Sequence, residues 1–108
     1  MTGSQLAAVG YLRQYRSMTR YQLSAAQEQL AAYAGQEGFL LRKVFVEQLD
    51  SDPAAFDALI KSVKRRKITV VIVPTTAHLS AVGDGETKLQ RLQRETGARA
   101  LAATGPPP

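Results

Sequence analysis

The side chains that can do chemistry in this sequence are of few kinds, and their types and spacing exclude several classes of site. The chain has no cysteine and a single histidine, His78, which excludes thiol catalysis, disulfides, thiolate metal sites and a histidine-rich metal centre. It has no Gly-x-Gly-x-x-Gly segment, no Gly-Lys-Ser/Thr loop to cradle phosphates, and no acidic cluster to hold a metal. We therefore expect neither a metal nor a cofactor.

Basic side chains are the remaining chemical feature. The chain carries 14 lysines and arginines against 9 aspartates and glutamates, a net charge of +5. They are densest in the segment KSVKRRK, Lys61–Lys67, and such a patch suits a phosphate backbone. Cations at a helix end also meet the negative end of the helix dipole, a structural role that requires no ligand. The candidate nucleic-acid contacts are Arg13, Arg16, Lys61, Lys64, Arg65, Arg66 and Lys67.

Length and composition predict one soluble globular domain. At 108 residues the chain can bury one core, and 44% hydrophobic with 21% charged residues is the balance of such a protein. No apolar run approaches the roughly 18 to 20 residues of a bilayer span, and the N-terminus lacks a signal-like pattern. We expect a cytoplasmic protein without membrane contact. The predicted domain covers residues 5–103, and the Pro-rich residues 104–108 are predicted to be a disordered tail.

Strand and helix patterns alternate along the chain. Ile68–Val73 has no charge and is almost entirely β-branched, which is typical of a central strand covered on both faces. One helix should begin at Pro53, with Ser51 or Asp52 as its N-cap, and should bury Phe56, Leu59, Ile60 and Val63. We expect strands at 6–12, 39–46, 68–73 and 98–102, and helices at 23–36, from 53 onward and at 86–96.

Helix ends are predicted from polar caps and glycines. Ser24 or a nearby polar residue is the expected N-cap of the helix at 23–36, and Gly38 is expected to stop it. Gly97 should end the helix at 86–96.

This alternation predicts a three-layer α/β fold. The economical arrangement is a mostly parallel sheet of four or five strands with helices on both faces, right-handed crossovers and flavodoxin-like winding. Functional residues of such sheets lie on loops at the carboxyl ends of the strands. Here those loops are expected at Arg13–Tyr21, Glu47–Asp52 and Pro74–Gly85.

The order of these elements, and several residues in them, resemble the N-terminal catalytic domain of the serine recombinases, the resolvases and invertases. In that family the first strand carries a Tyr-x-Arg-x-Ser signature, and here the sequence is Tyr11-Leu12-Arg13-Gln14-Tyr15. A later strand leads to Glu47, where the family has aspartate, with Ser51 four residues on. The resemblance covers about residues 7–102. The first helix is similar to the family's in Ser24, Gln27, Leu30, Tyr33, Ala34 and Gly38.

The resemblance implies a chemistry for which most residues are missing here. In the family a serine hydroxyl attacks a DNA phosphodiester and becomes covalently linked to the phosphate, and several arginines surround the transition state. At those positions this chain has Tyr15 for the nucleophile and keeps Arg13, while acidic Asp52 stands near the place of a further arginine. The family's Asp-Arg-Leu-x-Arg motif stands here as Ala77-His78-Leu79-Ser80-Ala81.

Simpler structural roles are open for each of these residues. Tyr15 suits a partly buried aromatic that caps the core, and Ser51 suits a helix cap. His78, alone on its loop, is expected to be an exposed polar residue. Arg13 suits an ion pair with an acid of the adjacent loop as well as it suits a phosphate.

Three functions follow from this interpretation. The leading hypothesis is a noncatalytic recombinase-like domain that acts as an oligomerisation or DNA-associated module, because family members pack as dimers and tetramers. The partners implied are a second copy of the chain, DNA, or another protein. The second hypothesis is an active strand-transfer domain that reaches DNA through a partner or a further DNA-binding region. The third is a nonspecific nucleic-acid-binding protein whose surface is the basic segment Lys61–Lys67.

Overall fold

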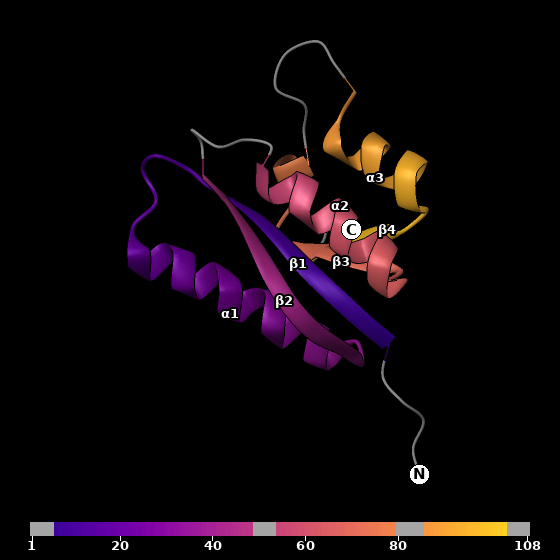
Figure 1. Cartoon of the computed structure of the whole chain (residues 1–108). Coiled ribbons are helices and arrows are strands. Elements are labelled where there is room, and N and C mark those ends of the chain that lie inside the picture. The colour runs from indigo at the N-terminus through magenta and orange to yellow at the C-terminus, as the bar shows by residue number, and fades with distance from the viewer. Residues whose placement is uncertain (1–5, 49–53, 80–85, 104–108) are drawn as a thin grey trace.

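The computed structural model describes residues 6–48, 54–79 and 86–103, and these residues form four strands, three α-helices and a short 3-10 helix (Figure 1). The predicted alternation of strand and helix is confirmed. In chain order the elements are β1 (Leu6–Gln14), α1 (Arg20–Gln36), β2 (Phe39–Gln48), α2 (Ala54–Arg66), β3 (Val70–Val73), the 3-10 helix η2 (Thr76–Leu79), α3 (Lys88–Thr96) and β4 (Arg99–Ala102).

The four strands form one parallel sheet in the order β2-β1-β3-β4. β1 and β2 pair from Leu6 beside Phe39 to Gln14 beside Gln48, with a register shift between Ala8 and Val9, where Arg42 of β2 is the extra residue. All four residues of β3 are buried, as its uncharged β-branched sequence predicts. The expected parallel α/β sheet with flavodoxin-like winding is confirmed.

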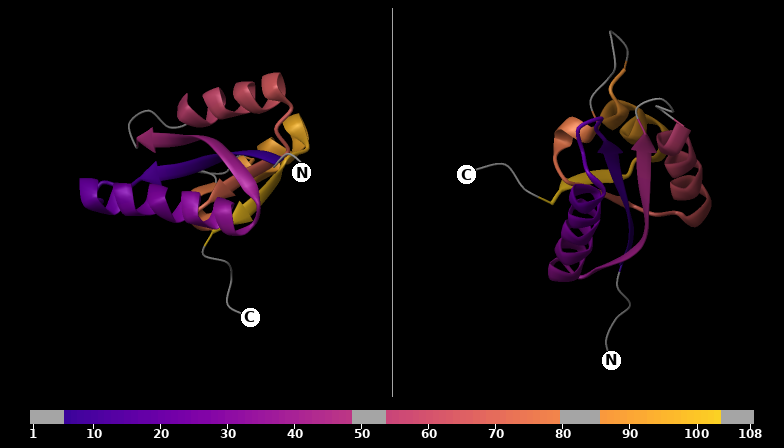
Figure 2. Two further views of the ribbon diagram at one scale, coloured as in Figure 1. Left: turned by 90° about the horizontal axis from the view of Figure 1, so that it is seen from below. Right: turned by 90° about the vertical axis from the view of Figure 1, so that its left-hand side faces the viewer.

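Helices cover both faces of the sheet, which gives three layers (Figure 2). Because side chains alternate across a strand, β1 sends Ala8 and Leu12 to one face and Val9 and Tyr11 to the other. The first face packs on α1, and the second packs on α2 and α3. The predicted stripe of α2 is fully confirmed, since its buried residues are Phe56, Leu59, Ile60 and Val63.

The ends of several elements differ from the prediction. α1 begins three residues earlier than expected because Thr19, not Ser24, is its N-cap: the Thr19 hydroxyl accepts from the Gln22 N–H, and the Gln22 side chain accepts from the Thr19 N–H. An equivalent capping box at Thr87 makes Lys88 the first residue of α3. The two glycines that were predicted to end helices do so. Gly97 is the left-handed C-cap of α3, and Gly38 has a positive φ just after α1.

The expected loops are shorter than predicted. Pairing with β2 carries β1 through Arg13 to Gln14, and β2 itself continues through Glu47 to Gln48. Polar residues therefore extend these strands, because backbone pairing with a neighbour outweighs local composition. The loop after β3 contains η2. The expected cap residues Ser51 and Asp52, and the proposed tail at 104–108, lie outside the described residues.

The described residues were also compared with the requirements of a membrane-spanning helix and of a metal site. Among the described residues no helix is both long and apolar enough to cross a membrane. The same residues contain no group of three or more acidic or histidine side chains placed to hold a metal ion.

Gly10 is a point of close approach between α1 and β1. A Cβ at this position would lie 3.0 Å from Leu30 Cδ1 and 3.2 Å from Val44 Cγ2. Contacts this short force neighbouring side chains to move, so the absence of a side chain here sets how near α1 lies to the sheet.

Replacing Gly10 by alanine should therefore lower the free energy of unfolding by about 1 to 3 kcal/mol, because the methyl overpacks the layer between α1 and the sheet. Urea unfolding followed by circular dichroism measures this. Gly35→Ala is the matched control: Gly35 lies in α1, and a methyl group there would meet no other atom within 4 Å, so the substitution should stabilise by about 0.5 to 1 kcal/mol. Equal stabilisation by both substitutions would contradict the close approach.

Candidate functional site

The carboxylate of Glu47 joins three elements at the carboxyl end of the sheet. The side chain is fully buried. It accepts hydrogen bonds from the Tyr11 hydroxyl at 3.2 Å, the Ala55 N–H at 3.0 Å and the Phe56 N–H at 2.9 Å. The two N–H groups belong to the first turn of α2, where no carbonyl of the helix can reach them and a negative charge is favoured. Glu47 therefore fixes the start of α2 against β1 and β2.

Tyr11, the first residue of the Tyr-x-Arg signature, belongs to the core. It is fully buried, and its ring meets the Phe56 ring edge to face with centroids 5.3 Å apart. Its hydroxyl donates to Glu47. Tyr11 and Glu47 thus both have structural roles in this chain.

Arg13, Tyr15 and His78 come together just beyond these groups. The Arg13 guanidinium carbon lies 5.9 Å from the centre of the Tyr15 ring. The Tyr15 and His78 rings meet edge to face at 5.5 Å, and the Arg13 backbone N–H donates to His78 Nδ1 at 2.9 Å. Because β1 and β3 are neighbours whose following helices cover opposite faces, this cluster lies at the topological switch point, where such sheets bind ligands.

His78 was expected to be exposed, and this prediction was wrong. It lies in η2 and is only 7% exposed. Burial, and after it the positive charge of Arg13, hold the pKa of His78 below its ordinary value of 6.5. Since Nδ1 accepts the hydrogen bond from Arg13, the proton of the neutral ring is on Nε2. His78 is therefore a neutral group at pH 7 and not a second cation beside Arg13.

Tyr15 is less buried than the expected core cap, with 38% of its surface exposed. Arg16 and Ser17 follow in an exposed turn, which the Met18 N–H closes on the Tyr15 carbonyl at 2.9 Å. Among the described residues, the site therefore offers the Arg13 guanidinium, the neutral His78 imidazole and the hydroxyl groups of Tyr15 and Ser17, with the exposed Arg16 side chain in the turn beside them. Ser51, the remaining candidate of the predicted site, lies outside the described residues.

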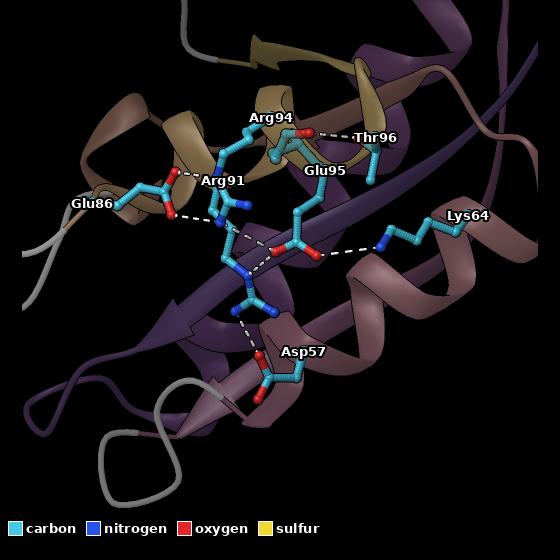
Figure 3. Close-up of polar contacts among 8 residues, drawn as sticks. Asp57, Lys64, Glu86, Arg91, Arg94, Glu95 and Thr96 are labelled. Carbon is cyan, nitrogen blue, oxygen red and sulfur yellow. Dashed lines mark hydrogen bonds and ion pairs between the residues drawn. The ribbon is translucent and has the colours of Figure 1, made fainter.

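A network of ion pairs joins α3 to α2 (Figure 3). Arg91 contacts Asp57 and Glu95, each at 2.6 Å, and Lys64 reaches Glu95 at 3.3 Å. The Glu95 and then the Asp57 hydrogen bonds raise the pKa of Arg91. Lys64, one of the predicted nucleic-acid contacts, is thus paired with a carboxylate.

The predicted nucleic-acid contacts lie at two ends of the sheet. Arg13 and Arg16 are at the carboxyl end of β1. α2 begins at that end, beside Glu47, and runs back toward the amino ends of the strands, which it reaches at Arg66 (Figure 1). The Lys61–Lys67 segment is therefore remote from Arg13. Arg42 and Lys43 of β2 lie beside this segment but were not predicted as contacts. In the sequence they are marked only by being two adjacent cations inside a strand.

Removing the Glu47 carboxylate should destabilise the fold strongly. We expect Glu47→Ala to lower the free energy of unfolding by about 3 to 5 kcal/mol, because two buried N–H groups and one hydroxyl lose their acceptor. Tyr11→Phe removes only one of these hydrogen bonds and should cost about 1 to 2 kcal/mol. Urea unfolding of both variants measures the difference, and similar losses for the two would show that Glu47 does not hold α2.

The buried imidazole should make stability depend on pH. With a lowered pKa in the folded state, His78 takes up its proton more readily when the chain unfolds, so its contribution to stability is complete above about pH 6.5 and is lost as the pH falls below that value. The slope should approach at most about 1.4 kcal/mol per pH unit. Urea unfolding between about pH 7.5 and 5.5 measures it, in the range where histidine titrates.

His78→Asn is the matched control, because its side-chain oxygen can accept from the Arg13 N–H but does not titrate. His78 is the sole histidine of the chain, so the variant should lose the dependence in this pH range. A dependence that persists unchanged in His78→Asn would assign it to another group.

Comparison with known proteins supports the fold. No protein-family model matches the chain, and no curated protein matches it. Among solved structures, it is similar to the C-terminal catalytic domain of ISC1926 TnpA, an IS607-like serine recombinase, with a TM-score of 0.74 and 23% sequence identity over 95% of this chain and 71% of that one. The expected recombinase-like architecture is thus confirmed: the chain has the fold of a serine recombinase catalytic domain.

Proposed function

We propose that this chain is a noncatalytic recombinase-like domain, which acts by binding, as an assembly or DNA-associated module, and does not cut DNA strands. The observation that carries the proposal is the packing of Tyr15 at the position expected for the nucleophile. Its ring contacts both the Arg13 guanidinium and the neutral His78 ring. The groups that would have to bind and attack a phosphate instead contact one another.

The shortage of positive charge supports the same proposal. Phosphoryl transfer gathers negative charge on the transferring group, and each fixed donor that is removed costs about 3 to 4 kcal/mol of transition-state stabilisation. Here Arg13 keeps its position, whereas His78 stands where the resemblance places an arginine and is neutral. Ala77 and Ala81 bring no charge to the other positions of that motif.

Strand transfer by a substitute nucleophile is the competing function. The partly exposed phenol of Tyr15 and the exposed Ser17 hydroxyl both lie close in sequence to Arg13. A phenol or alcohol attacks phosphorus effectively only when a base or fixed cations activate it. One guanidinium that packs on the attacking ring meets that need poorly, so we favour the noncatalytic function.

A covalent-adduct assay tests the proposal. The full chain is incubated with supercoiled plasmid and with labelled duplex DNA, and detergent-resistant protein–DNA adducts are sought on a denaturing gel. We expect no adduct and no nicking, because the attacking group lacks its cations. An active serine recombinase on its own site is the positive control for the assay.

The variants decide which hydroxyl acts if DNA is cut. An adduct that disappears in Tyr15→Phe, or in Ser17→Ala, would overturn the noncatalytic proposal and identify the nucleophile. Sedimentation velocity of the same preparation tests the assembly role, for which a concentration-dependent dimer is expected. A chain that stays monomeric at every concentration would limit the proposed role to association with DNA or another protein.

A further inference from the structure

A cationic groove lies between β2 and the C-terminal half of α2. It encloses a hollow of about 390 Å³. The buried side chains of Val9, Phe45 and Ile68 form its apolar floor. Its charged lining, which we call the basic groove, consists of Arg42 and Lys43 from β2 and Lys61, Arg65 and Arg66 from α2.

The positive charge of the basic groove is not balanced by nearby acids. Among the described residues that line it, none carries a carboxylate. Within the residues that the structure describes, none of the five cations forms an ion pair, whereas Lys64, Arg91 and Arg94 on the α3 side of the fold all do. Lys43 is held over the Phe45 ring, with its ammonium nitrogen 4.9 Å from the ring centre. The groove thus concentrates like charge around one hollow, which favours an anion there.

The cations of the basic groove form two rows, one on β2 and one on α2. A structural role can explain each row by itself, but not why the two rows face each other. Arg65 and Arg66 lie in the last turn of α2, where the helix dipole favours positive charge. Arg42 and Lys43 lie on β2, an edge strand, where charges prevent pairing with another chain. Neither role requires the two rows to face the same hollow. Their convergence is the independent sign of a negatively charged ligand.

We infer that the basic groove binds the phosphate backbone of a nucleic acid, without preference for sequence. Cations stand on two walls, with Lys61 and Arg65 one turn apart on α2, so a chain of regularly spaced phosphates can contact both rows. Phe45 is the one aromatic side chain among the described residues of the lining, and at 7% exposed it offers bases no platform for stacking. Contacts to phosphates position a nucleic acid but do not read its bases.

This inference rests on the binding role proposed above, but not on the loss of cleavage. α2 spans 13 residues from Ala54 to Arg66, or about 18 Å at 1.5 Å per residue. A nucleic acid in the groove therefore lies at the opposite end of the sheet from Tyr15. An adduct in the cleavage assay would overturn the noncatalytic function and leave the groove untouched, whereas the titration below tests the groove alone.

A salt titration of paired variants tests the groove. Binding of the full chain to a fluorescein-labelled DNA duplex of mixed sequence is followed by anisotropy over a series of salt concentrations. The first variant is Arg42→Gln with Lys43→Gln, and the second is Arg65→Gln with Arg66→Gln. The matched control is Arg20→Gln with Arg99→Gln, which removes the same charge from exposed positions outside the groove. Circular dichroism verifies that each variant is folded.

Each groove variant should bind more weakly and depend less on salt. The logarithm of the binding constant falls with the logarithm of salt concentration by about 0.9 for each phosphate neutralised. We therefore expect each groove pair to reduce this slope by about 1 to 2, while the control pair leaves it unchanged. Two results overturn the inference: no binding to the duplex even at low salt, or an equal reduction by the control pair, which would indicate diffuse charge.

Competition separates a nucleic acid from other phosphate chains. Unlabelled duplex should displace the labelled duplex, and inorganic polyphosphate should compete with it because both present closely spaced phosphates. If polyphosphate binds wild-type chain and loses affinity in the groove variants while the duplex does not bind, the groove is a polyphosphate site and the inference of a nucleic acid is overturned.

Discussion

The buried carboxylate of Glu47 accepts hydrogen bonds from the Tyr11 hydroxyl and from two backbone N–H groups of α2. A charge with no access to water is stable only when such donors surround it. This need fixes β1, β2 and the start of α2 in one arrangement. The ion pairs of α2 with α3, and the cations of its last turn, take their positions from this arrangement. Glu47 thus serves the assembly of the fold.

The switch point of the sheet, where such folds bind ligands, is occupied by the chain's own side chains. Tyr15 packs on His78, and the Arg13 backbone donates to the imidazole. The burial that lowers the pKa of His78 also removes the positive charge that a phosphate would require there. A neutral imidazole can be buried here at a lower cost than a guanidinium, whose charge would lose its hydration.

The sequence predicts the layers of this fold better than its site. Apolar patterns reflect burial directly. They identified the central strand from ITVVIV, and the packed face of α2 from Phe56, Leu59, Ile60 and Val63. Helix starts were missed where a reciprocal cap, as at Thr19, lies outside the apolar pattern. The burial of His78 depends on how η2 folds over the end of β1, which local sequence does not show.

Only the α2 side of the basic groove could be predicted from the sequence, because the pairing of its two rows depends on how the chain folds. The run Lys61–Lys67 stands out in the sequence, but its residues have different environments. Lys64 forms an ion pair with Glu95, whereas Lys61, Arg65 and Arg66 line the hollow. Arg42 and Lys43 join them only because β2 lies beside α2. The basic groove and the cluster of Arg13, Tyr15 and His78 share no residue and lie at opposite ends of the sheet. A substitution in one can therefore change its chemistry without changing the side chains of the other.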